Sequence, residues 1–148
     1  MKKFLGIAIT ITLSCVASTA WSTPEGVLNG QWSLTLSNYQ DSCGREPTVA
    51  KSFALIQQGK DLDAIVEIAG EKGAVHTVNF SGDLSSAGPP ANVVMKGKFE
   101  IDGFTTEEEM DIQIIDASTF EGSAKWTTTS ADMKTVCVGS DDVSGAKK

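Results

Sequence analysis

One histidine and one glutamate are the side chains of this chain with the clearest capacity for chemistry. His76 is the only histidine, and it lies in KGAVHTVNFSGD, a run whose polar and apolar alternation is typical of a half-buried strand. Glu108 belongs to an acidic run but has the phase of the inward residues, opposite Gly97. A buried carboxylate must find a partner or take up a proton. We therefore expect Glu108 to anchor a polar group, with His76 and Thr106 as its candidate partners.

These side chains predict a binding site rather than a catalytic one. Histidine and glutamate can do acid–base chemistry, but the sequence pattern places no nucleophile beside them, and the chain has no G-x-S-x-G motif. We expect a non-enzymatic site that holds a polar head group beside an apolar wall. The alternative is that the polar members lie at a rim and contact only water. The expected ligand-binding residues are His76, Glu108, Thr106, Met95, Phe99, Met110 and Trp126.

The cysteines predict a disulfide and not a metal site. Cys43 and Cys137 are the only cysteines after residue 20, and 94 positions separate them. An even number of cysteines in an oxidising compartment favours a disulfide, which for a loop of this length stabilises by roughly 4 to 5 kcal/mol. Neither the C-x-x-C nor the H-x-x-x-H spacing of zinc sites is present, and the acidic run lacks the EF-hand spacing. We predict no metal and no cofactor.

Residues 1–20 predict a secretory signal peptide. Two lysines precede an apolar run at 4–13, and small residues follow at Ser18 and Ala20. We expect cleavage after Ala20, which leaves 21–148 as a single secreted or periplasmic domain. The alternative is a lipoprotein attached through Cys15, which is less favoured because a serine precedes that cysteine. No later apolar run is long enough to span a bilayer as a helix.

Net charge limits the classes of partner. Cleavage would change the net charge from -7 to -9, because two lysines leave and all nineteen acidic residues remain. An acidic surface repels nucleic acid and anionic membranes and favours cationic protein partners. The simpler interpretation is that the charge only keeps a secreted domain in solution.

Turn residues predict the pairing of the strands. Asp102-Gly103 is a two-residue hairpin signal, because both central residues of a type I′ turn have positive φ. That register places Lys98 opposite Glu107 and Lys96 opposite Glu109, where each pair of opposite charges adds roughly 0.2 to 1 kcal/mol. The acidic run is thus predicted to be mainly an ion-paired outer face.

The same reasoning sets the direction of the histidine. A turn at Gly59-Lys60 places Phe53 opposite Val66 on the inward face. A three-residue loop at 71–73, with a left-handed glycine, then places His76 opposite Ile68 and inward.

Eight short alternating segments joined by short connections predict an all-β fold. An up-and-down order with one apolar face closes most naturally into an eight-stranded antiparallel barrel, and a β-sandwich is the alternative. The last strand is expected within Met133–Val138, and Trp32 is expected at the end opposite the 71–73 and 102–103 turns.

Gly30, Gln31 and Trp32, at the start of the first strand, resemble the G-x-W signature of lipocalin-like barrels. The resemblance extends over most of the mature chain through the strand count. It implies a tryptophan that closes the narrow end of the barrel, and a small molecule bound in its cavity.

Three functions follow as hypotheses. The first is a binding protein for a small, partly apolar ligand, with space left by small inward residues at 64, 97, 122 and 124. The second is an acidic protein-binding module, such as an inhibitor of a cationic enzyme of the lysozyme kind. The third is a structural envelope protein whose barrel is filled.

Overall fold

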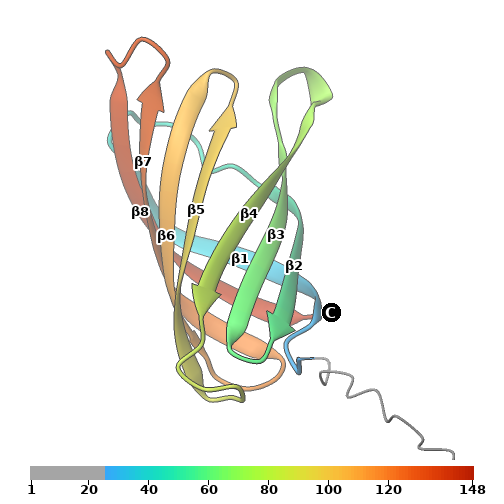
Figure 1. Cartoon of the computed structure of the whole chain (residues 1–148). Coiled ribbons are helices and arrows are strands. Elements are labelled where there is room, and N and C mark those ends of the chain that lie inside the picture. Colours follow the sequence, from blue (N-terminus) through green and yellow to red (C-terminus); the bar gives the residue numbers. More distant parts are fainter. Residues whose placement is uncertain (1–25) are drawn as a thin grey trace, which may run out of the picture.

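The computed structural model describes residues 26–148, which form eight antiparallel strands closed into one barrel (Figure 1). Each strand pairs with its neighbours in sequence, and the last pairs with the first. The predicted up-and-down barrel is therefore confirmed, and it is compatible with a lipocalin-like fold. The elements are β1 (Gly30–Asp41), β2 (Ala50–Gln58), β3 (Asp61–Ala69), η1 (Glu71–Gly73), β4 (Val75–Asp83), β5 (Ala91–Ile101), β6 (Phe104–Ile114), β7 (Thr119–Ser130) and β8 (Val136–Lys147).

The predictions of a signal peptide and of no membrane-spanning helix concern the location of the protein. The signal peptide, its cleavage site after Ala20 and the alternative lipidation site at Cys15 lie outside the described residues. Within residues 26–148, no helix is both long enough and apolar enough to cross a membrane.

The strand registers follow the turn chemistry. Ile101 pairs with Phe104 across the turn at Asp102 and Gly103, and these two turn residues have positive φ. Ile68 pairs with His76 across the connection between β3 and β4. Since side chains alternate across a strand, these registers fix which residues of β3 to β6 have the inward phase.

The last strand begins later and runs further than the sequence predicted. We expected it within Met133–Val138, but β8 occupies Val136–Lys147. Its Gly, Ser and Asp residues have low strand propensity, but β8 is hydrogen-bonded to β7 on one side and to β1 on the other. Pairing on both sides thus overrides the local preference.

The later start of β8 also explains the disulfide. Cys137 lies at the beginning of β8, beside the loop that follows β1, and it is bonded to Cys43 with a Cα–Cα distance of 5.5 Å. The predicted pairing is confirmed. It ties the 42–49 loop to the barrel wall.

The end of the barrel where β1 begins and β8 ends is filled. Trp32 is 1% exposed, and its indole Nε1 donates a hydrogen bond to the Leu28 carbonyl at 3.0 Å. The rings of Trp32 and Phe53 lie 5.5 and 5.9 Å from the ring of Phe120. Gln57 Oε1 accepts a hydrogen bond from the Leu28 amide. The expected closing role of Trp32 is met, and only the opposite end of the barrel is open.

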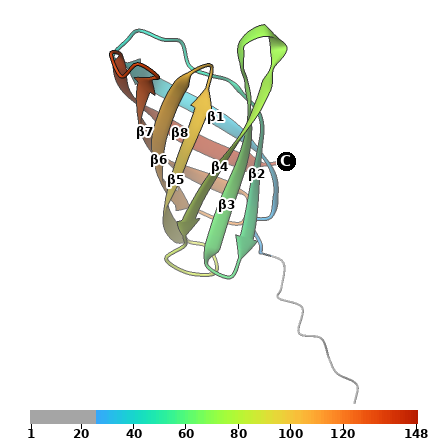
Figure 2. The ribbon, with the colours of Figure 1, turned by 45° about the horizontal axis from the view of Figure 1, so that its top comes forward.

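The open end, called the mouth below, comprises the loop 42–49 and the turns at 70–74, 102–103 and 131–135 (Figures 1 and 2). The seam between β4 and β5 has the fewest aligned residue pairs of the barrel, Ser81 with Lys96 alone. Both views show the two strands diverging toward the mouth. Asp102 spans this divergence, since one of its oxygens accepts a hydrogen bond from the Glu71 amide at 3.2 Å.

Small inward residues do not by themselves create the cavity, contrary to the sequence expectation. A side chain at Gly97 would collide with the ring of Phe80, and one at Gly139 with the ring of Trp126. These glycines let aromatic rings lie flat against the wall. Any open volume in the barrel must therefore come from the length of the strands beyond the filled end.

Candidate functional site

A cavity of about 520 Å³ occupies the half of the barrel nearest the mouth. Its volume lies within the range of about 300 to 1,000 Å³ that is usual for small-molecule sites. The larger apolar side chains of its wall are Leu34, Leu36, Phe53, Val66, Ile68, Phe80, Phe99, Ile101, Phe104, Met110 and Val143. The charged ones are Arg45, Glu46, Glu71, Asp102, Glu108 and Asp141.

Strand register places two of these carboxylates at successive depths. Glu108 pairs with Gly97 on one side and Trp126 on the other, which forms one inward row across β5, β6 and β7. Asp141 pairs with Ala124 in the next row away from the mouth. The small Ala124 side chain leaves Asp141 facing the cavity, which it lines.

Both carboxylates are held without a cation. Asp141 is 6% exposed, and its Oδ1 has no hydrogen-bond partner. Among residues 26–148, no lysine, arginine or histidine forms an ion pair with Asp141 or Glu108. Burial, assisted by the nearby Asp141 charge, raises the pKa of Glu108 to about 7. Burial and the Asp142 charge raise the pKa of Asp141 to about 6.

The guanidinium nearest to this site is already neutralised. Arg45 donates to Asp41 Oδ2 from Nη2 at 2.7 Å and from Nε at 3.1 Å, and the Asp41 side chain is 1% exposed. The Arg45 hydrogen bond lowers the pKa of Asp41 to about 2. Trp126 Nε1 also donates to this carboxylate at 3.4 Å, and the Trp126 ring stacks on Tyr39 with centroids 5.2 Å apart. Arg45 therefore brings no free positive charge to the cavity.

The residues predicted from sequence lie in three different places. The cavity wall includes Glu108, Thr106, Phe99, Met110 and Trp126. Met95 instead has 0% exposure within the packed core. His76 has the inward phase but is not in the cavity wall; it lies against Gly70, with Nε2 at 3.9 Å from Asp102 Oδ1.

The expected partners of Glu108 are engaged elsewhere. Thr106 Oγ1 and Thr128 Oγ1 are 2.9 Å apart and share one hydrogen bond. The closest charged contact of His76 is Asp102 in the 102–103 turn, because His76 is at the start of β4 and both residues lie at the mouth. Neither residue is hydrogen-bonded to Glu108 in the described part of the chain.

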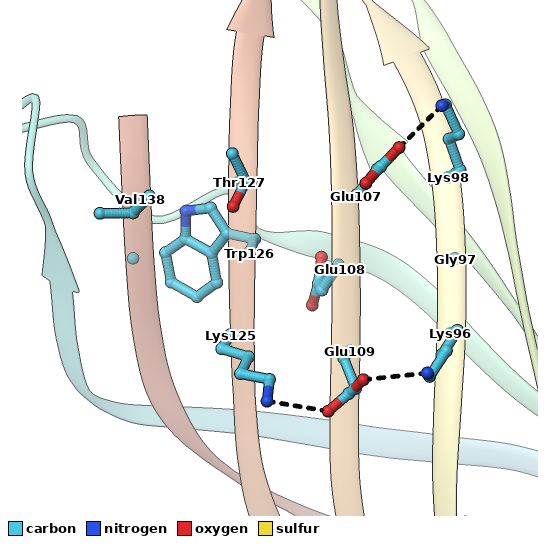
Figure 3. Close-up of a pocket in the computed structure, with 11 residues that line it drawn as sticks. Lys96, Gly97, Lys98, Glu107, Glu108, Glu109, Lys125, Trp126, Thr127 and Val138 are labelled. Carbon is cyan, nitrogen blue, oxygen red and sulfur yellow. Dashed lines mark hydrogen bonds and ion pairs between the residues drawn. The ribbon is translucent and has the colours of Figure 1, made fainter. Parts of the chain in front are cut away.

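The outer wall of β5 to β8 carries a second depression, shown in Figure 3. Two rows of outward side chains border it: Glu109 bridges Lys96 and Lys125 at 3.3 and 2.9 Å, and Lys98 pairs with Glu107 at 2.7 Å. The depression arises because the row between them, with Glu108 and Trp126, belongs to the inward face. The predicted ion pairs are thus present, and their lysine side chains are largely exposed. Such solvated pairs describe an outer surface better than a ligand site.

Asp141 is the residue of this site that sequence reasoning missed. We ended the last strand at Val138, so the residues after it received no inward or outward phase. The signal available in the sequence was that Cys137, Asp141 and Val143 share one phase of a strand, and the structure buries all three. The low strand propensity of this glycine- and serine-rich segment concealed it.

Among residues 26–148, the closest grouping of metal-ligating atoms is Asp41, Cys43 and Cys137. The two sulfur atoms of this group are bonded to each other, so they are not available as thiolate ligands. No protein-family model matches this chain, and no curated protein is significantly similar to it.

Proposed function

We propose that this barrel is a non-enzymatic binding protein that holds one small, partly apolar molecule in the cavity at its mouth. The observation that carries the proposal is the contrast between the two halves of the barrel. One end is filled by Trp32, Phe53 and Phe120, whereas the other keeps about 520 Å³ of open volume. A barrel of eight strands is wide enough either to be filled by its side chains or to hold one small ligand.

The lining supports a ligand with one apolar part and one polar part. Leu36, Phe53 and Val66 line the apolar wall of β1 to β3, and Glu108 lies across the barrel in β6. The disulfide supports a secreted or periplasmic location, because such bonds persist in oxidising compartments. Within residues 26–148, His76 Nε2 has no hydrogen-bond partner, so no hydroxyl group is bonded to it as a serine nucleophile is to its base.

The test is a titration with N-phenyl-1-naphthylamine, an uncharged probe that fluoresces in apolar surroundings. We expect saturable binding at one molecule per chain. Leu36→Trp places a large side chain in the cavity and should weaken binding at least tenfold. Thr35→Trp adds the same side chain on the outer face and serves as the control. Equal binding by both variants would show that the probe occupies some other surface.

A second candidate is protein binding at the mouth. Large apolar side chains are exposed around it, including Val49 at 75%, Met133 at 76% and Phe104 at 40%. Glu46, Glu71 and Asp102 line the same opening and favour a cationic partner such as a basic enzyme. Capture of lysozyme on immobilised protein should weaken as salt rises from about 0.05 to 0.5 M, because screening shortens the reach of the charges. Capture that does not change with salt would count against this candidate.

A further inference from the structure

The lining of the cavity carries far more negative than positive charge. Glu46, Glu71, Asp102, Glu108 and Asp141 contribute carboxylates, and Arg45 is the only basic residue of the wall. Arg45 is committed to Asp41 through two hydrogen bonds. An anionic head group would therefore meet repulsion at the mouth and no free cation inside.

The deepest of these carboxylates is also incompletely satisfied. Asp141 is more than nine-tenths buried, lines the cavity, and has an oxygen, Oδ1, without a hydrogen-bond partner. Buried polar atoms are nearly always hydrogen-bonded, so this oxygen, in a residue that lines the cavity, lacks the donor that such an atom normally has. Glu108 lies one row nearer the mouth, and its pKa is raised by burial and by the nearby Asp141 charge.

We propose that the ligand of this cavity is a primary or secondary amine with an apolar body and a positively charged nitrogen. The amine group enters the cavity first and lies between Glu108 and Asp141. This inference rests on the proposed binding function and names the chemical class of the ligand. An ammonium group offers several N–H donors and a positive charge, whereas the two carboxylates offer only acceptors when ionised. The apolar body then lies nearer the mouth, beside Leu36 and Phe99.

The depth of the inward residues explains why the amine group would enter the cavity first. Asp141 lies level with Met110 and Ala124, one row deeper than Glu108. Next toward the mouth is the row of Thr106 and Thr128, whose hydroxyl groups already satisfy each other. A ligand that kept its charge at the mouth would leave the two deep carboxylates unpartnered.

The first test compares three ligands of equal chain length, octylamine, octanol and octanoic acid, by isothermal titration calorimetry at pH 8. We expect octylamine to bind at least about tenfold more tightly than octanol, because hydrogen bonds between charged groups are stronger than those of a neutral hydroxyl group. Octanoate should bind most weakly. If octanol or octanoate binds as tightly as octylamine, the amine inference is wrong and the proposed function stands. If none of the three binds, the amine inference is wrong, and the proposed function is overturned with it if N-phenyl-1-naphthylamine also fails to bind.

Matched variants locate the effect. Asp141→Asn and Glu108→Gln should each reduce the preference for octylamine over octanol at least about fivefold. Asp142→Asn and Glu107→Gln make the same changes at adjacent outward residues and should keep the preference, since those side chains pair with Asn38 and Lys98 on the outer face. If the inward variants keep the preference as well, the amine does not lie between these carboxylates.

The pH dependence gives an independent readout. Between pH 8 and pH 5 the ionised fraction falls about tenfold for a group with the pKa of Asp141 and about ninetyfold for one with that of Glu108. Octylamine affinity should fall at least about tenfold, while octanol affinity changes little. The other groups beside this pair are Tyr39, Asp41, Arg45 and Asp142. Nearer the mouth lie Glu46, Glu71, His76 and Asp102. Octylamine binding that is as tight at pH 5 as at pH 8 would contradict the inference.

Discussion

Replacing Glu108 by glutamine should stabilise the protein, and increasingly so as pH rises. Burial raises the pKa of Glu108 from 4.5 to about 7, so the folded state holds a proton that the unfolded state has already lost between those values. The stability associated with that proton is fully present below pH 4.5 and is lost as pH rises through about 7. At about 1.4 kcal/mol for each tenfold change in proton affinity, the cost of ionising Glu108 reaches at most about 3 kcal/mol at pH 8.

The assay is urea unfolding followed by tryptophan fluorescence, with the disulfide intact, at pH 5 and pH 8. The gain in the free energy of unfolding of Glu108→Gln over the natural chain should be about 2 to 3 kcal/mol larger at pH 8 than at pH 5. At typical urea sensitivities, this corresponds to a shift of the midpoint by roughly 1 to 2 M.

The control is Glu107→Gln, whose carboxylate is on the outer face and is paired with Lys98. The Lys98 contact lowers the pKa of Glu107, so this variant should lose a little stability at neutral pH instead of gaining it. The reasoning is refuted if Glu108→Gln shows the same gain at pH 5 and pH 8, because Glu108 would then ionise in the folded barrel without cost.

Three further outcomes follow from the structure. Reducing the bond between Cys43 and Cys137 should lower the free energy of unfolding by roughly 4 to 5 kcal/mol, because this disulfide closes a loop of 94 residues. Urea unfolding with and without reductant measures the change, and a loss under about 1 kcal/mol would contradict this expectation. Trp32→Ala should cost about 3 to 5 kcal/mol by thermal or urea unfolding, because it empties the filled end of the barrel, and a cost near zero would mean that this end is not packed as described. Gly139→Val should displace the Trp126 ring and shift its fluorescence, whereas an unchanged spectrum would show that the ring does not lie on Gly139.

Most of the fold could be predicted from the residues of the turns, because they set the strand registers. The 102–103 and 71–73 turns set the registers of β5 with β6 and of β3 with β4, because a one-residue slip would turn every apolar side chain outward. The inward phase of Glu108 follows directly from the first of these registers. Such local rules need no knowledge of distant contacts, which is why they succeed.

What sequence could not supply depends on contacts between distant segments. The second carboxylate, Asp141, lies in a strand that local propensity does not favour and that exists because β1 and β7 pair with it on both sides. Sequence places His76 inward and near the mouth, but its position beside Gly70, outside the cavity wall, depends on the path of the 70–74 connection. The neutralisation of Arg45 by Asp41 depends on the path of the 42–49 loop.

Native mass spectrometry of protein purified gently from its own host tests the binding role most directly. The account predicts one small molecule bound per chain, lost on denaturation and absent from Leu36→Trp, in which the cavity is occupied by a side chain. A bare native mass for the natural chain, together with no binding of octylamine, octanol or N-phenyl-1-naphthylamine, would contradict it and leave protein binding at the mouth and a structural role as the remaining candidates.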